Sequence, residues 1–144
     1  MEQNVHFVTV ATPDLVAARA FYIDGLGWSA LLDVPGEIIF FQIAPGAVLG
    51  LFDSVKFAED LGIPAAGAVN GLTLAHNLPS PEEVDRCVET AARLGAKVVK
   101  QPQQAAFGGY HGHFADPNGL LWEIAYNPGW TIDASGRVAI AVIG

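Results

Sequence analysis

Hydrophobic and polar positions follow one order of elements twice along this chain. In each half a β-rich run comes first, a helical stripe follows it, and three short β-rich runs come after. Strands alternate every two residues, whereas amphipathic helices repeat every 3.6 residues. The pattern therefore predicts an α+β fold of two βαβββ modules. Strands are expected at 5–11, 29–34, 37–43 and 47–52, and at 72–78, 97–100, 110–114 and 120–126.

Capping residues place the two main helices near 13–24 and 81–94. Thr12 is a candidate N-cap followed by proline, and Gly25 is a plausible stop. The second helix begins with a capping box at 80–83 and ends at Gly95. We expect one domain over residues 1–144. Its parts are module one at about 4–53, a linker at about 54–70, module two at about 71–127, and a tail at 128–144. The linker is expected to hold a short helix at 54–61, and the tail an extra strand at 138–143.

Composition narrows the classes of partner. Half of the 144 residues are hydrophobic (51%) and 15% are charged, which is typical of an ordered, compact chain. The net charge of −8 disfavours nucleic acid or an anionic membrane as a partner. Cys87 is the single cysteine, so no internal disulfide can form. The sequence shows neither a signal-peptide pattern nor an apolar run of membrane-spanning length, and we expect a cytoplasmic protein.

The segment 107–125 carries the candidate chemistry. Two apolar, aromatic-rich runs flank Asp116-Pro-Asn-Gly119, which has the composition of a hairpin turn. His111 and His113 are two residues apart, so they share one face of a strand. Glu123 stands in an otherwise apolar strand, where its charge must be paired or hydrated. These three side chains are the candidates for a site.

The register of this hairpin decides what Glu123 faces. If the turn carries an extra residue at Gly119, as in a G1-type bulge, His113 lies opposite Glu123 and His111 opposite Ala125. Without that bulge, Gly112 faces Glu123 and both histidines point to the other face, because a slip of one residue exchanges the faces.

Several motifs resemble the vicinal-oxygen-chelate superfamily, which includes glyoxalase I, extradiol dioxygenases and bleomycin resistance proteins. Asp116-Pro-Asn-Gly-x-x-x-Glu123 is similar to the closing hairpin of this superfamily, and Asp14-Leu15 with the string 21–28 is similar to its first helix and exit turn. The string 108–117, with Asn127-Pro128 after it, resembles an uncharacterised glyoxalase-like bacterial subgroup. The resemblance spans about 5–130. It implies two modules that form a cupped, partly open barrel-like sheet, a homodimer, and the bulged register.

In the metalloenzymes that the sequence resembles, the residue at the Glu123 position ligates a metal together with residues from three other strands. The matching run 47–52 offers no Glu or His, and the run 70–73 offers only Asn and Thr. On the first strand Phe7 matches the ligand position better than His6 does. We therefore expect no cofactor. A divalent metal remains an alternative, with Glu123 and His113 as its ligands and His111 completing a two-His-one-carboxylate set.

We assign Glu123 as the candidate catalytic residue. The expected ligand contacts come from aromatic, histidine and threonine side chains: His113, His111, Tyr110, Phe107, Phe41, Thr73 and Thr9. We expect His113 and Glu123 to lie within hydrogen-bonding reach or one water apart. Such a pair would raise the pKa of His113 and lower that of Glu123, while burial opposes both shifts.

Three functions are compatible with the sequence. The first is a protein that binds a small organic molecule in an apolar cup, with an unassigned lyase or isomerase activity or with none. The second is a metal-dependent lyase or dioxygenase that uses Glu123. The third is a non-catalytic protein that sequesters an antibiotic, for which an acidic chain suits a cationic drug. The expected partners are a small-molecule ligand and a second copy of the chain, with no nucleic acid and no membrane.

Overall fold

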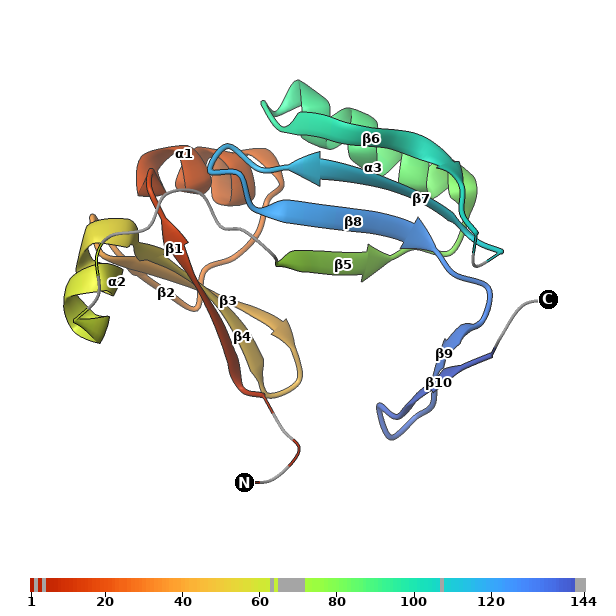
Figure 1. Cartoon of the computed structure of the whole chain (residues 1–144), viewed down its shortest axis with the longest axis horizontal. Helices are drawn as coiled ribbons and strands as arrows, with labels where there is room; N and C mark the ends of the chain where they lie inside the picture. Colours follow the sequence, from red (N-terminus) through yellow and green to blue (C-terminus); the bar gives the residue numbers. More distant parts are fainter. Residues whose placement is uncertain (2, 4, 63, 65–71, 107, 142–144) are drawn as a thin grey trace. The chain divides into compact units, whose positions relative to one another are not determined.

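The computed structural model describes residues 1, 3, 5–62, 64, 72–106 and 108–141 (Figure 1). The chain divides into two compact units. The first consists of Met1–Leu72 with Asp116–Leu120, and the second of Thr73–Ala115 with Leu121–Gly144. Each contains a four-stranded sheet. Among the described residues, no helix is long and apolar enough to cross a membrane.

The first unit is built on the sheet order β1-β4-β3-β2, in which β1 runs parallel to β4 and the other pairs are antiparallel. Its elements are β1 (Phe7–Thr12), α1 (Leu15–Arg19), η1 (Ala20–Gly25), β2 (Leu32–Val34), β3 (Ile38–Ala44), β4 (Ala47–Asp53) and α2 (Ser54–Leu61).

The second unit repeats this topology with the order β5-β8-β7-β6, and β5 runs parallel to β8. The prediction of an α+β fold from two βαβββ modules is therefore confirmed. Its elements are β5 (Thr73–Asn77), α3 (Pro81–Arg93), β6 (Lys97–Gln104), β7 (Tyr110–Ala115), β8 (Leu121–Tyr126), β9 (Trp130–Ile132) and β10 (Val138–Ile140). Strand β10 confirms the described part of the predicted tail strand. Residues 142–143 of that strand lie outside the described residues.

The first helix begins differently from the prediction, but the helical segment ends at Gly25, as expected. Asp14 is its N-cap and accepts a hydrogen bond from the Ala17 amide at 2.9 Å, whereas the Thr12 hydroxyl donates to the Val10 carbonyl at 3.0 Å. After one α-helical turn the chain widens into the π-helix η1, which ends at Gly25, and Gly27 takes a positive φ two residues later. Thr and Asp are both good N-caps, so the sequence pattern alone favours neither.

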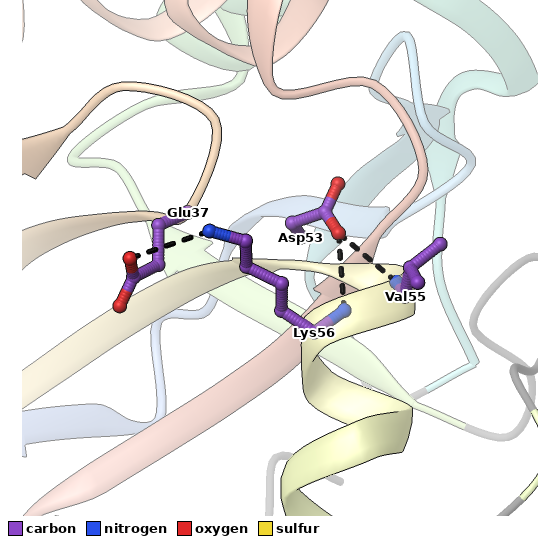
Figure 2. A network of polar contacts seen from close by, with 4 residues as sticks. All are labelled: Glu37, Asp53, Val55 and Lys56. Atoms are coloured by element: carbon purple, nitrogen blue, oxygen red, sulfur yellow. Dashed lines mark hydrogen bonds and ion pairs between the residues drawn. The ribbon is translucent and has the colours of Figure 1, made fainter.

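The other two helices have clear capping contacts. The Ser80 hydroxyl accepts from the Glu83 amide at 3.3 Å at the start of α3, as the capping box predicts. At the start of α2 the Asp53 carboxylate accepts from the amides of Val55 and Lys56, both at 3.1 Å (Figure 2). The Lys56 ammonium also reaches Glu37 at 3.4 Å. The contacts made by Ser80 and Asp53 satisfy backbone amides that a helix start leaves without partners.

In each unit one face of the sheet is packed against the helix that follows its first strand. In the first unit, β-strand residues such as Leu49 and Phe41 are buried together with Phe21 and Tyr22 of the helical segment. The second unit buries Phe114, Trp122 and Ile124 on the α3 side, together with Val84, Val88 and Ala91 of the helix. The opposite sheet faces are where functional side chains can meet solvent.

The turn of the β7–β8 hairpin has the predicted bulge. The Asp116 amide donates to the Leu120 carbonyl at 2.9 Å, and Gly119 has φ +88°, which only glycine adopts without strain. The buried Asp116 carboxylate accepts from the Tyr22 hydroxyl at 2.9 Å and from the amides of Asn118 and Leu120 at 2.8 Å. Burial raises the pKa of Asp116, and these hydrogen bonds oppose that shift. The turn thus belongs to the first unit.

Candidate functional site

The bulged register brings three ionisable side chains to the face of the second sheet that lies away from α3. His113 pairs with Glu123, and His111 pairs with Ala125, as the bulged alternative predicts. One ligand atom from each of His111, His113 and Glu123 lies within 4.8 Å of the others. All three side chains are partly exposed, so a solute can reach them. We call this surface the histidine face.

The direct partner of Glu123 is His111. Its Nδ1 lies 2.7 Å from Oε1 of Glu123, whereas Nε2 of His113 lies 4.0 Å from the same oxygen. The two imidazole rings stand edge to face, with their centroids 5.1 Å apart. His113 and Glu123 are thus as near each other as expected, but the direct hydrogen bond to Glu123 comes from His111. The register was predicted, but the side-chain rotamers that choose between the two histidines were not.

Lys100 is a fourth member of this group, and the sequence analysis missed it. Its Nζ lies 2.7 Å from Nε2 of His111. An ammonium group can only donate, so Nε2 accepts and the ring hydrogen must sit on Nδ1. Nδ1–H then donates to Glu123. Lys100, His111 and Glu123 form one directed chain of hydrogen bonds. We call these three residues together with His113 the polar cluster.

Two irregularities in β6 bring Lys100 to this position. The register of β6 against β7 shifts on both sides of Lys100, which leaves it opposite His113. Gly112 of β7 makes this possible, because a Cβ there would lie 3.0 Å from the Pro102 backbone nitrogen and 3.1 Å from the Lys100 carbonyl oxygen. Proline within a strand and glycine on its neighbour are sequence signals of such a bulge.

His113 differs from the expectation in its protonation. Burial lowers the pKa of His113 below its ordinary value of 6.5; the charge of Lys100, and that of His111 when it is protonated, add to this, and Glu123 opposes it. The expected increase is therefore wrong, because Glu123 at 4.0 Å is too distant to outweigh desolvation. Among the described residues, Nδ1 of His113 is buried without a hydrogen-bond partner. Such an atom is costly unless a ligand satisfies it.

The remaining predicted contact residues lie in different surroundings. The Tyr110 hydroxyl donates to Asp85 of α3 at 2.9 Å, so Tyr110 faces the helix, and its role as a ligand contact stays a prediction. Phe41 is 1% exposed and packs against Tyr22 and Trp28 in the first unit, so core packing engages its side chain. Phe107 lies outside the described residues.

The two predicted threonines are exposed on their respective sheets. Thr73 pairs with Leu121, two residues before Glu123, and therefore lies on the histidine face. Thr9 pairs with Gly50 in the first unit.

A cavity of about 410 Å³ lies at one end of the second sheet. Asn77 of its wall pairs with Ala125, and Ala125 pairs with His111, so this wall begins two strands away from the polar cluster. Sequence reasoning missed the cavity because three of its seven lining residues come from the tail after β8. The lining residues are Asn77, Leu78, Pro79, Tyr126, Asn127, Pro128 and Trp130.

The donor types of the polar cluster suit a divalent metal, because two imidazoles and a carboxylate are a common ligand set. Their arrangement does not. A histidine ligates through a nitrogen lone pair, yet Nε2 of His111 already accepts from Lys100 and Nδ1 carries a hydrogen. The charge of Lys100 would also repel a cation. The three residues of a His/His/Glu metal site are thus present, but the hydrogen bonds of His111 leave it no lone pair for a metal ion.

The family is shown by comparison with known proteins. The model of the Glyoxalase/Bleomycin resistance protein/Dioxygenase superfamily matches residues 4–124. The chain therefore belongs to this superfamily, as the sequence motifs indicated. No curated protein matches the chain.

Solved structures agree with this membership. The chain is similar to a glyoxalase-related enzyme from Fulvimarina pelagi, with 36% identity and a TM-score of 0.88 over 97% of this chain and 99% of that chain. A glyoxalase/bleomycin resistance protein/dioxygenase from Nocardioides is 28% identical, with a TM-score of 0.71 over 88% of this chain and 84% of that one. Lactoylglutathione lyase from Agrobacterium tumefaciens is 26% identical, with a TM-score of 0.67 over 87% and 94%.

Proposed function

We propose that the histidine face binds a small organic molecule, with the polar cluster at one end of the ligand and the 410 Å³ cavity at the other. The observation that carries this proposal is the hydrogen-bonded chain from Lys100 through His111 to Glu123, with both contacts at 2.7 Å. Ordered, partly exposed ionisable groups beside a cavity are the usual elements of a small-molecule site.

The dimensions support a ligand that spans both parts. Adjacent strands are about 4.8 Å apart, so Asn77 and His111, two strands apart, are separated by roughly 10 Å along the sheet. Trp130 and Tyr126 offer aromatic surface in the cavity, and Asn77 and Asn127 offer amides. The cavity suits the apolar or aromatic part of a ligand, while the polar cluster fixes its orientation.

Glu123 is the residue we propose for proton transfer. The Nδ1–H of His111 orients its carboxylate, which remains accessible enough to meet a ligand. A fixed carboxylate beside imidazoles is suited to remove a proton and return it elsewhere, as a lyase or an isomerase requires. Thr73 is a candidate contact on the same face, and Thr9, Phe41 and Phe107 stay predictions.

A metal-dependent reaction is the second candidate, because His111, His113 and Glu123 converge within 4.8 Å. Since Lys100 blocks His111, we propose that the purified protein holds well under one equivalent of transition metal. Metal analysis of untagged protein tests this. Stoichiometric Zn, Ni, Mn or Fe that is lost in Glu123→Gln would favour the metal-dependent candidate.

The binding proposal is tested by NMR with a panel of small fragments that differ only in one group: carboxylate, amide, amine or hydroxyl on a phenyl or short alkyl body. We expect selected fragments to shift the ring signals of His111 and His113 and the indole signal of Trp130 together. Asn77→Leu should weaken binding without changing the cluster. Fragments that shift only signals of the first unit would contradict the proposal.

Assembly and location stay predictions. We propose a homodimer, because sheet edges need cover and the resemblance implies it. Sedimentation at micromolar concentration that shows only a 15.2 kDa species would contradict the dimer.

A further inference from the structure

We propose that the ε-ammonium of Lys100 is the resident cation of the polar cluster: it takes the place on His111 that a divalent metal would need, and it offers its charge to an oxyanion group of the ligand. The second part rests on the proposed function. The first part concerns only Lys100, His111, His113 and Glu123, and it is tested without a ligand.

One contact blocks both nitrogens of His111. Because the ammonium donates to Nε2, the lone pair of that nitrogen is engaged. The same bond fixes the tautomer, so Nδ1 carries its hydrogen toward Glu123 and has no lone pair for a metal. Without Lys100 the lone pair of Nε2 becomes available for coordination, while Glu123 still accepts from Nδ1–H. Lys100 therefore controls the chemistry of His111 through hydrogen bonding as well as through charge.

The rest of the cluster is already arranged as a metal site would be. His113 and Glu123 are opposite one another, and Nε2 of His113 lies 4.0 Å from the Glu123 carboxylate. Nδ1 of His113 is buried without a partner among the described residues, so a ring rotation that used it would break no hydrogen bond. Three donors within 4.8 Å need only small movements to meet one ion.

The half-buried position of Lys100 makes its charge available to a ligand. An ammonium has three donors, and His111 takes one of them. A carboxylate or enolate oxygen beside Lys100 would gain a charge-assisted hydrogen bond, which is stronger than a neutral one. In this way the lysine supplies, without a metal, the positive charge that stabilises an oxyanion.

The experiment measures metal binding by the wild type and by four variants of the full chain. Co²⁺ binding is monitored by visible absorption, and Zn²⁺ binding is measured by calorimetry. Lys100→Met should bind both ions at least about tenfold more tightly than wild type. The substitution removes a neighbouring positive charge and leaves Nε2 of His111 available as a ligand. Lys100→Arg should remain like wild type. Lys97→Met is the matched control, because it removes an equal charge from the same strand at a residue paired with Ala115, away from the polar cluster. It should leave the affinity for both ions unchanged. Adding Glu123→Gln to Lys100→Met should abolish the gain.

Equal metal affinity of wild type and Lys100→Met would overturn the proposal, and so would a gain that Lys97→Met reproduces. The ligand part is tested with the fragment panel: carboxylate fragments should lose at least about tenfold affinity in Lys100→Met, while amide fragments should not. If no fragment binds the wild type, the proposed function fails, and the metal titration still decides the role of Lys100. If carboxylates bind Lys100→Met as well as wild type, the oxyanion role is wrong.

Discussion

The two sheets share one topology but present different outer faces. On the face of the first sheet away from its helix, Phe7 and Phe40 stack edge to face at 5.4 Å, and Phe7 and Leu32 are 52% and 47% exposed. On the matching face of the second sheet, the polar cluster gathers two histidines, a glutamate and a lysine. We call the first surface the phenylalanine face, formed by Phe7, Thr9, Leu32 and Phe40.

This difference separates what determines the fold from what determines the chemistry. The helix-covered faces of both sheets are apolar and buried, and they repeat the same strand order. The outer faces are under no such packing constraint, so one can be aromatic and the other ionisable. A shared fold therefore identifies the family, while the reaction depends on the residues of one face.

The largest expected effect on the free energy of unfolding is found by comparing two neighbouring residues of β7 whose side chains point to opposite faces. Phe114→Ala removes a 4% exposed ring from the α3 side and should lower the free energy of unfolding by about 3–5 kcal/mol. His113→Ala should lower it by less than about 1 kcal/mol, because this side chain is partly exposed and one of its nitrogens lacks a partner. Urea unfolding measures both. Equal losses would mean that the histidine face is part of the core.

A matched pair of glycine substitutions compares the two sheets themselves. Gly112→Ala forces a Cβ to within 3.0 Å of backbone in β6, so it should cost about 1–3 kcal/mol and release Lys100 from His111. Gly50→Ala meets the ring of Phe40 at 3.1 Å on the exposed phenylalanine face, where the ring can move aside. We expect less than about 1 kcal/mol there. Thermal unfolding of both variants tests the order, and a larger loss for Gly50→Ala would contradict it.

Changing the pH should have a smaller effect on the free energy of unfolding, through His113. Because burial lowers the pKa of His113 in the folded state, the unfolded chain binds more protons just below pH 6.5. The contribution of His113 to stability is therefore complete above the unfolded pKa and is lost as pH falls toward the folded pKa. Unfolding measured between pH 5 and 8 should show stability falling in acid, and less steeply in His113→Asn. An unchanged slope in that variant would mean that another group is responsible.

Much of the second sheet was predictable from local chemistry. The Asp116-Pro-Asn-Gly119 turn allowed two registers, and the resemblance to the superfamily favoured the observed one, which puts His113 opposite Glu123. The choice of His111 as the direct partner depends on rotamers, which no periodicity encodes. Lys100 reaches the cluster through two register shifts, and strict strand alternation cannot follow such shifts.

The first unit shows the same limit. Its strands and helix positions follow from apolar spacing, yet the N-cap moved from Thr12 to Asp14 and half of the predicted helix is a π-helix. The cavity at the end of the second sheet depends on Trp130 and its neighbours in the tail, whose place follows from tertiary packing. Local signals thus gave the elements, and long-range packing determined the site.

The central claim is that Lys100, His111 and Glu123 act as one hydrogen-bonded unit on the histidine face. The most direct measurement is the tautomer of His111, read from long-range ¹H–¹⁵N correlations of the imidazole at neutral pH. The account predicts a hydrogen on Nδ1 and an unprotonated Nε2 in the wild type. This preference should be unchanged in Lys97→Met and weaker in Lys100→Met, where Glu123 alone still selects the tautomer. A wild-type ring with its hydrogen on Nε2 would contradict it.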